Sequence, residues 1–366
     1  MSNARRHILH IETGRHLYGG AYQALLLIKG LHQRGLRNTL VCPRSSQIAG
    51  SAAGYADIHP LAYAGDLDPR FPLRLRQLVK RLSPDLIHVH SRRGADYWAP
   101  VATTGLGVPL LLSRRVDNAE PFWLARWKYR RYAKIITISE QIRQVLIAEG
   151  VPAAKLQRVY SAVPLPAKPA APDREWFRET FALPPETPVI GVVAQLIPRK
   201  GHRYLIEALP AVRREFPAVR AVFFGQGPLE GALRRACRSA GLEDAVLFAG
   251  FRRDIPRIMP CLDAVVHPAT TEGLGVALLE AAASARPVVA FRAGGIPEIV
   301  ENGRTGWLVE IGDRQGLSRC IRALLRHPDR AAQMGQAGWH LLRQRFDDGA
   351  MVAGNLDVYA DLLARP

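Results

Sequence analysis

Two glutamates in the second half of the chain have the residue type and spacing that a ligand site needs. Glu272 directly precedes the sequence Gly-Leu-Gly, and Glu280 follows eight residues later in a run of alanine and leucine. Glycines leave backbone N–H groups open to a phosphate or sugar at the start of the next helix. An acid in so apolar a helix costs free energy unless it is paired, and ribose hydroxyls would pair it. A helix-capping Glu272 and a backbone-bonded Glu280 are the ordinary alternatives.

Two adjacent cations, Arg199 and Lys200, follow an apolar strand-like run and precede Gly201 and a helix-like pattern. Positive side chains beside a helix N-terminus suit an anion such as a diphosphate. A pair of solvated surface cations is the alternative interpretation. The two glutamates and the two cations therefore form one candidate site only if the fold brings their strand ends together.

The elements that would position these residues alternate between short apolar strands and helices, which favours parallel sheets covered on both faces. Residues 163–173 contain four prolines and predict an extended linker, after which the alternation restarts. We expect an α/β protein with two Rossmann-like doubly wound domains over 1–165 and 166–346. A terminal helix over 347–366 is expected to pack back toward the first domain. Such sheets bind ligands at the carboxyl ends of their strands, so the cleft between the domains is the expected substrate site.

The net charge of +18 is concentrated in the first half, where residues 1–165 hold 24 Lys and Arg against 10 Asp and Glu. This asymmetry suggests an anionic partner, although an arginine-rich composition is an alternative cause. The chain lacks RNA-binding and helix-turn-helix patterns, an eighteen-residue apolar run and a signal-peptide core. We expect a cytoplasmic protein that does not bind nucleic acid, and the basic half allows peripheral contact with the inner face of a membrane.

The four cysteines are scattered, which favours reduced thiols.

Polar residues that follow two strands of the first half are candidates for binding a second substrate. They are Arg92, Arg93, Asp96, Arg114, Arg115 and Asp117. Guanidinium groups bind phosphate and carboxylate through paired hydrogen bonds, so a phosphorylated or acidic sugar would fit. A salt-bridged surface loop is the alternative. Nearby, residues 123–132 interleave aromatic and basic side chains, which favours a helix with a buried aromatic face over a membrane-surface helix.

From His267 to Gly312 the sequence closely resembles the retaining GT-B glycosyltransferases of family 4. The resemblance rests on the two glutamates, on Gly294-Gly295-Ile296-Pro297-Glu298 and on the segment 302–309. Upstream, the segments 198–201, 225–228 and 246–251 match other motifs of that family in the same order. The resemblance to this family extends over nearly the whole chain and is strongest over 189–312. It implies a GT-B fold and a transferase similar to those of lipopolysaccharide core and other cell-envelope glycans.

The resemblance also implies a role for each matched residue. Arg199 and Lys200 would hold the donor diphosphate, Glu280 would bind the ribose, and Glu272 would orient the donor sugar. The catalytic candidates are therefore Arg199, Lys200 and Glu272. The remaining implied donor-binding residues are Gly19, Gly20, Phe251, Arg252, Gly273, Leu274, Gly275 and Val276. No metal and no cofactor is implied, because the two cations replace a divalent ion; the donor itself would be UDP- or GDP-linked. Arg115 or Val116 stands where the family often has a histidine beside the donor sugar.

The expected reaction is transfer with retained anomeric configuration, in which the donor phosphate helps to take the acceptor proton. The expected acceptor is a phosphorylated or lipid-linked glycan. Two alternatives remain open from the sequence. One is a GT-B-shaped sugar-nucleotide epimerase, which would need no acceptor. The other is a non-catalytic basic module that binds nucleic acid or an anionic membrane.

Overall fold

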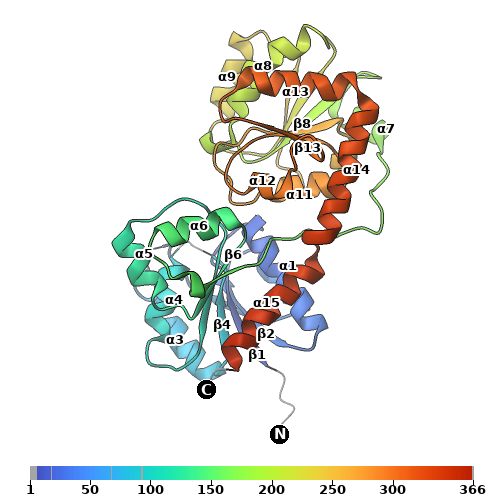
Figure 1. Cartoon of the computed structure of the whole chain (residues 1–366). Coiled ribbons are helices and arrows are strands. Elements are labelled where there is room, and N and C mark those ends of the chain that lie inside the picture. Colours follow the sequence, from blue (N-terminus) through green and yellow to red (C-terminus); the bar gives the residue numbers. More distant parts are fainter. Residues whose placement is uncertain (1–5, 18, 67, 92–93, 365–366) are drawn as a thin grey trace. The chain divides into compact units, whose positions relative to one another are not determined.

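The computed structural model describes residues 6–17, 19–66, 68–91 and 94–364. The chain forms two compact units (Figure 1). The first comprises the chain up to Ala162 together with Asp348–Pro366, and the second comprises Val163–Asp347. Each unit is a parallel sheet with helices on both faces, so the expected α/β class with two Rossmann-like units is confirmed.

The sheet of the first unit has seven strands in the order β3-β2-β1-β4-β5-β6-β7, all parallel. Its central strands are buried along their length, as expected for a sheet covered on both faces. The strands are β1 (His7–Ile11), β2 (Arg37–Pro43), β3 (Asp57–Leu61), β4 (Leu86–Val89), β5 (Leu110–Arg114), β6 (Lys134–Thr137) and β7 (Leu156–Arg158). The helices are α1 (Gly19–Gln33), α2 (Ile48–Ala52), α3 (Phe71–Leu82), α4 (Ala95–Thr103), α5 (Phe122–Tyr129), α6 (Glu140–Ala148), the 3-10 turn η1 (Ala153–Lys155) and α15 (Asp348–Leu363).

The C-terminal helix α15 lies along α1 on one face of this sheet (Figure 1). The two helices approach closely because Gly30 has no side chain, and a Cβ there would overlap Val352. Tyr359 of α15 reaches the sheet, and its hydroxyl lies 2.7 Å from His88 Nδ1 on β4. Apolar side chains, this buried polar contact and an ion pair of 3.2 Å between Asp361 and Lys134 therefore hold α15 to the first unit.

The sheet of the second unit has six strands in the order β10-β9-β8-β11-β12-β13, again all parallel. The strands are β8 (Val189–Val193), β9 (Arg220–Phe224), β10 (Val246–Gly250), β11 (Ala264–His267), β12 (Val288–Phe291) and β13 (Gly306–Val309). The helices and 3-10 turns are α7 (Arg174–Phe181), η2 (Pro198–Lys200), α8 (His202–Arg213), α9 (Glu230–Ser239), α10 (Ile255–Ile258), η3 (Met259–Cys261), α11 (Val276–Ala283), α12 (Ile296–Ile299), α13 (Arg314–Arg326) and α14 (Pro328–Arg345). Helices α8, α9 and α13 cover one face, and α11 and α14 cover the other (Figure 1).

In each sheet the first strand of the unit is central, and the strand order reverses beside it. The reversal lies between β1 and β4 in the first unit and between β8 and β11 in the second. Helices on opposite faces diverge at this point, and the crevice between them is where open α/β sheets bind ligands. The loops after these four strands are therefore the places where a ligand site is expected.

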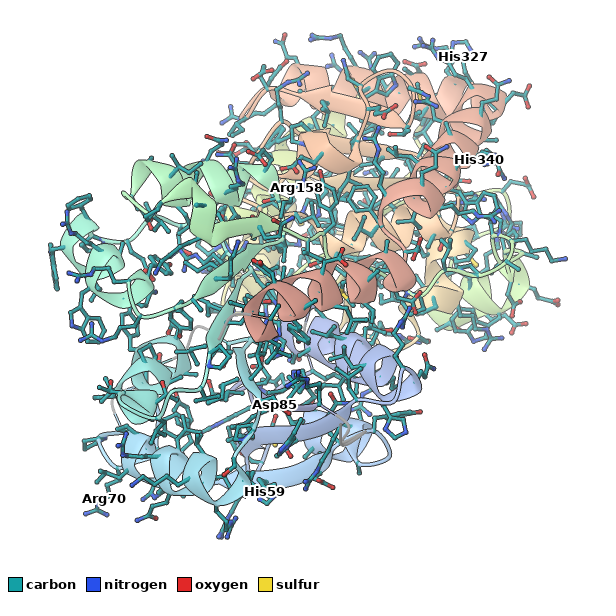
Figure 2. All side chains as sticks on the ribbon, turned by 60° about the horizontal axis from the view of Figure 1, so that its bottom comes forward. His59, Arg70, Asp85, Arg158, His327 and His340 are labelled. Atoms are coloured by element: carbon teal, nitrogen blue, oxygen red, sulfur yellow. The ribbon has the colours of Figure 1, made fainter. Side chains whose placement is uncertain are left out.

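Charged side chains gather on the outside of both units. Arg70, Arg158 and His327 are exposed, and Arg70 and His327 project outward from the ribbon (Figure 2). Among the helices that the structure describes, none combines the length and the apolar character that crossing a membrane requires.

Candidate functional site

Lys200 and Glu272 meet at the switch point of the second sheet, although 72 positions separate them in the sequence. Lys200 ends η2 in the loop after β8, and Glu272 follows β11, the strand that pairs with β8. The Lys200 ammonium donates to Glu272 Oε2, which also lies 2.9 Å from His267 Nε2. The fold thus brings the predicted cation and the predicted acid into direct contact.

The loop that carries Lys200 lies tightly against the loop after β11. Gly201 has φ of 68°, and a Cβ there would overlap the carbonyl oxygen of Pro268. The Arg199 carbonyl accepts a hydrogen bond of 2.9 Å from the Thr270 amide. The Arg199 guanidinium is exposed and donates to the Thr271 carbonyl at 3.3 Å. Only glycine fits this backbone approach, which explains the glycine directly after the two cations.

The charge of Glu272 is fixed by its two partners. Burial alone would raise the pKa of this carboxyl, but the hydrogen bond from His267 and the charge of Lys200 outweigh burial and lower the pKa well below its usual range. Burial lowers the pKa of His267 in spite of its contact with Glu272, so the imidazole is neutral. At neutral pH the centre therefore contains a Lys–Glu ion pair, and exposed Arg199 adds a further positive charge.

The backbone from Glu272 to Val276 leads into α11. Gly273, Leu274 and Gly275 are buried, and Gly275 caps the helix with φ of 103°. The Gly295 amide donates to the Glu272 carbonyl at 3.0 Å, which fixes the turn. The first N–H groups of a helix lack partners inside the helix and favour an anion. This helix start, Lys200 and Arg199 all lie at the same end of the sheet and favour negative charge there.

Glu280 is partly buried on α11, and no side chain or amide that the structure describes donates a hydrogen bond to it. Burial raises the pKa of its carboxyl from 4.5 to about 7. The fold does not compensate this acid, so it lowers stability. Ligand hydroxyls at this position would supply the missing hydrogen bonds.

Replacing Glu280 with glutamine is expected to stabilise the free protein at high pH. The raised pKa means that the folded state binds more protons than the unfolded state between pH 4.5 and 7, so wild-type stability falls through that window. Glu280→Gln should therefore unfold at higher urea concentration at pH 8, by up to about 3 kcal/mol, and by much less at pH 5. Exposed Glu243→Gln is the matched control, with little change at either pH. A Glu280→Gln chain less stable than wild type at pH 8 would show that the fold already stabilises the charged acid.

Phe251 and Arg252 follow β10, two strands away from β8. The Phe251 ring is 49% exposed. Arg252 forms a two-point ion pair with Asp254, with Nε to Oδ1 at 2.8 Å. An exposed ring at a strand end offers a face on which a base can stack.

In the first unit, the predicted acceptor residues lie in different surroundings. Arg92 and Arg93 lie outside the described residues. Asp96 and Arg114 are buried in an ion-pair network around Lys128 and Glu120, both of which the sequence analysis missed. The Lys128 ammonium lies 2.8 Å from Asp96 Oδ2 and 2.6 Å from Glu120 Oε2.

Arg114 completes this network at 3.4 Å from Glu120 Oε1 and 2.5 Å from the Asn118 carbonyl. A buried ion pair is strongly disfavoured once one partner is removed. Asp96 and Arg114 are therefore better explained as structural residues than as acceptor ligands. Arg115 and Asp117 are half-buried, and Arg115 lines a pocket of about 220 Å³.

The same pocket lies beside the predicted glycine loop. Gly19 and Gly20 begin α1, and a Cβ on Gly20 would lie 3.5 Å from Arg115 Cδ. Gly20 and Val116 also line the pocket. Gly20 of the predicted glycine loop therefore lines the same pocket as Arg115 and Val116, one of which stands where the family often has a histidine.

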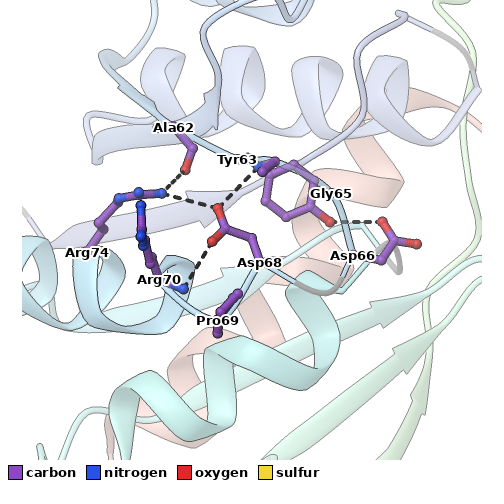
Figure 3. A pocket seen from close by; sticks show the side chains of 9 residues that line it. Ala62, Tyr63, Gly65, Asp66, Asp68, Pro69, Arg70 and Arg74 are labelled. Carbon is purple, nitrogen blue, oxygen red and sulfur yellow. Dashed lines mark hydrogen bonds and ion pairs between the residues drawn. The ribbon is translucent and has the colours of Figure 1, made fainter.

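Asp66 and Asp68, which form an Asp-x-Asp pattern in the sequence, line a larger hollow of about 940 Å³ in the first unit (Figure 3). Such carboxylate pairs can hold a divalent cation. Here Asp68 accepts from the amides of Ala64 and Arg70 and pairs with Arg74 at 3.1 Å. Asp66 accepts from the Tyr63 hydroxyl at 3.0 Å (Figure 3). Asp68 is committed to loop structure, which argues against a cation site at this pair.

Three buried histidines at the centre of the first sheet form a cluster that sequence patterns did not indicate. Ligand nitrogens of His10, His88 and His90 lie within 4.8 Å of one another. His10 Nδ1 lies 2.9 Å from His90 Nε2, and His88 bridges Ser113 and Tyr359. Burial lowers the pKa of all three, so the cluster is a neutral hydrogen-bonded network.

Comparison with known proteins extends over both units. Residues 18–165 match the family described as Glycosyltransferase Family 4, and residues 187–327 match the one described as Glycosyl transferases group 1. The GDP-mannose-dependent alpha-(1-6)-phosphatidylinositol monomannoside mannosyltransferase of Mycolicibacterium smegmatis is 35% identical over 77% of this chain and 69% of that protein. The 2-deoxystreptamine glucosyltransferase of Streptomyces kanamyceticus is 30% identical over 74% of this chain and 76% of that protein.

Among solved structures, Anabaena HepE in complex with UDP-glucose superposes with a TM-score of 0.86 at 22% identity. The match covers 97% of this chain and 99% of that chain. At this identity the likeness establishes the fold alone.

Proposed function

The chain belongs to glycosyltransferase family 4 and is a nucleotide-sugar-dependent transferase of the GT-B fold, and from this premise we propose the details of its reaction. We propose that it transfers a hexose-type sugar with retained configuration, without a metal, to a glycan or glycolipid of the bacterial cell envelope. The lipopolysaccharide core is one such acceptor, and UDP or GDP carries the donor sugar. The observation that carries the proposal is the contact of Lys200 with Glu272 at the switch point of the second sheet.

Each part of this centre has a task in the proposed reaction. Lys200 and Arg199 stabilise the negative charge that develops on the leaving diphosphate. Glu272 holds the Lys200 ammonium in place, and the start of α11 presents backbone N–H groups to the distal phosphate and donor sugar. Glu280 accepts hydrogen bonds from the ribose. Phe251 stacks on the base.

The geometry supports retention without a covalent intermediate on the protein. Glu272 Oε2 contacts both Lys200 and His267, and an anion held by two donors is a weak nucleophile. In the proposed reaction, the donor phosphate helps to take the proton of the acceptor hydroxyl. Two cations at the diphosphate supply the positive charge that a divalent ion provides in other phosphate chemistry.

The acceptor side of the proposal rests on charge. The excess positive charge falls on the first half of the chain, where an anionic or lipid-linked acceptor would be attracted. The relative from Mycolicibacterium smegmatis is described as acting on a phosphatidylinositol monomannoside. A phosphorylated glycolipid is the acceptor class that fits both observations.

Helix α5 supports contact with an anionic membrane. The expected buried aromatic face over 123–132 is confirmed for Tyr129 and Tyr132 but wrong for Trp123 and Trp127, which are 71% and 39% exposed. Phe122, directly before that segment, is 56% exposed, and Lys128 is buried. Cations at 126, 130 and 131 are exposed beside the aromatic rings. Exposed tryptophans among cations suit the interface of an anionic bilayer.

Replacing Trp123 and Trp127 together with alanine is expected to weaken binding to vesicles of phosphatidylglycerol and phosphatidylcholine about tenfold or more, because both rings would leave the interface. Co-sedimentation measures the effect. Leu73→Ala removes a side chain that is 64% exposed on α3 and should leave binding unchanged. Equal binding by the double variant and wild type would place membrane contact elsewhere or exclude it.

The reaction itself is tested by incubating the chain in EDTA with UDP- and GDP-linked hexoses and a lipid extract of a Gram-negative envelope. The proposal predicts a glycosylated lipid whose new anomeric centre, assigned by NMR, matches the donor. An epimerised donor formed without an acceptor would favour the epimerase alternative. Salt-sensitive DNA binding without nucleotide-sugar binding would favour the non-catalytic alternative.

A further inference from the structure

Arg115 follows β5 in the first unit and makes no hydrogen bond or ion pair with any residue that the structure describes. Its Nε is fully buried. Burial lowers the pKa of the guanidinium to about 10, so it is still a cation at neutral pH. An uncompensated charge in a desolvated place costs free energy, which an anionic ligand would recover.

Two acidic residues, Glu12 and Asp96, line the pocket with Arg115, and each has another partner. Asp96 is held by Lys128, which also pairs with Glu120. Glu12 favours the charged form of the cation from beyond ion-pair distance, while its Oε1 accepts a backbone amide at 2.8 Å. Within the part of the chain that the structure describes, Arg115 therefore has no direct counter-ion.

The histidine network behind Arg115 supplies no charge. Asn38 Nδ2 donates to two carbonyls, so Asn38 Oδ1 must accept from His10 Nε2. Neutral His10 then accepts at Nδ1 from His90 Nε2. Burial, with contributions from neighbouring histidines and from Arg115, lowers the pKa of His88 and His90. The wall of the pocket is polar but neutral on this side.

The pocket in front of Arg115 has other features that favour an anion. Gly20, Ser91 and Ser113 line it beside Arg115 and His90. Helix α1 is fifteen residues long and begins at this wall, so its free N–H groups and positive dipole end lie next to the guanidinium. A pocket of about 220 Å³ accommodates one small anionic group.

We propose that this pocket binds an oxyanion, a phosphate or carboxylate group of a substrate, with Arg115 as its cation. The guanidinium offers two parallel hydrogen bonds to such a group, which a lysine could not reproduce. The identity of the substrate rests on the proposed function, in which two substrates could supply the oxyanion. One is the diphosphate of the donor, and the other is a charged group of the acceptor.

The test uses the full chain in chloride-free buffer, with Lys200→Met as background to remove the cation of the second unit. Inorganic phosphate should raise the melting temperature of this background, because a ligand of the folded state stabilises it. Adding Arg115→Gln should abolish the rise, Arg115→Lys should keep part of it, and exposed Arg81→Gln should leave it unchanged. No rise in the background, or an equal rise with Arg115→Gln, would overturn the proposal.

Titrations of UDP, GDP and glycerol 3-phosphate into wild type and Arg115→Gln then identify the source. The pocket belongs to the acceptor if Arg115→Gln binds the nucleotides within twofold of wild type but binds glycerol 3-phosphate at least about tenfold more weakly than wild type. If Arg115→Gln instead binds UDP or GDP about tenfold more weakly than wild type, the pocket binds the donor diphosphate. If UDP and GDP bind to neither chain, the proposed function fails, and the phosphate result at Arg115 stands by itself.

Discussion

Replacing Lys200 with methionine is expected to lower kcat for sugar transfer by about 10²–10³-fold, because the leaving diphosphate loses a positioned cation. Methionine keeps much of the length and apolar surface of the lysine stem, so the change is mainly one of charge. Initial rates with a nucleotide-sugar donor at saturating acceptor measure the effect. Far-ultraviolet circular dichroism should confirm a folded chain.

Arg213→Met is the matched control for this prediction. Arg213 belongs to the same unit and forms a two-point ion pair with Asp244 on the surface, with Nη2 to Oδ2 at 2.8 Å. Its loss removes one cation and one ion pair, yet kcat should stay within twofold. If Lys200→Met retained wild-type kcat, the diphosphate would have to be stabilised by other residues.

Replacing Glu272 with glutamine is expected to reduce both stability and activity. The Lys200 and Glu272 side chains are only 13% and 11% exposed, so the variant leaves an ammonium nearly buried without its counter-ion. Such a loss costs about 3–5 kcal/mol. The pKa of Glu272 lies below its usual range, so its stabilising contribution is present throughout neutral pH and is lost only in strong acid.

The double variant Lys200→Met/Glu272→Gln separates a structural role from a catalytic one. Removing both charges should recover much of the stability lost in Glu272→Gln, with a coupling energy of about 1–3 kcal/mol in urea unfolding. Activity should stay low in all three variants, because the cation that stabilises the leaving group is absent or displaced. Recovery of activity along with stability would mean that the pair serves only the fold.

The architecture and the positions of the proposed donor-binding residues followed from local patterns. Apolar strands alternating with helices specify a parallel doubly wound sheet, and that topology places the ends of β8 and β11 side by side. Lys200 and Glu272 could therefore be placed together from the sequence. Their ion pair and the neutral His267 beneath it depend on side-chain packing, and no spacing rule predicts that.

The roles of the acceptor candidate residues were harder to predict because surface and buried charges look alike in a sequence. Lys128 lies within a run of cations and aromatic residues, and only the fold shows that it is buried against Asp96 and Glu120. The buried face of α5 contains that lysine and Tyr129, whereas Trp123 and Trp127 are exposed, contrary to expectation. An acid shortly before such a segment, here Glu120, is the sequence signal that could have indicated the network.

The most direct test of a donor site at Lys200 and Glu272 is a calorimetric titration of UDP and GDP into wild type, Lys200→Met and Arg213→Met. Wild type and Arg213→Met should bind one of the nucleotides at one site per chain with similar affinity. Lys200→Met should bind it at least about tenfold more weakly, because a charge-assisted contact to the diphosphate is lost. Equal affinity in Lys200→Met and wild type would contradict a donor site at these residues.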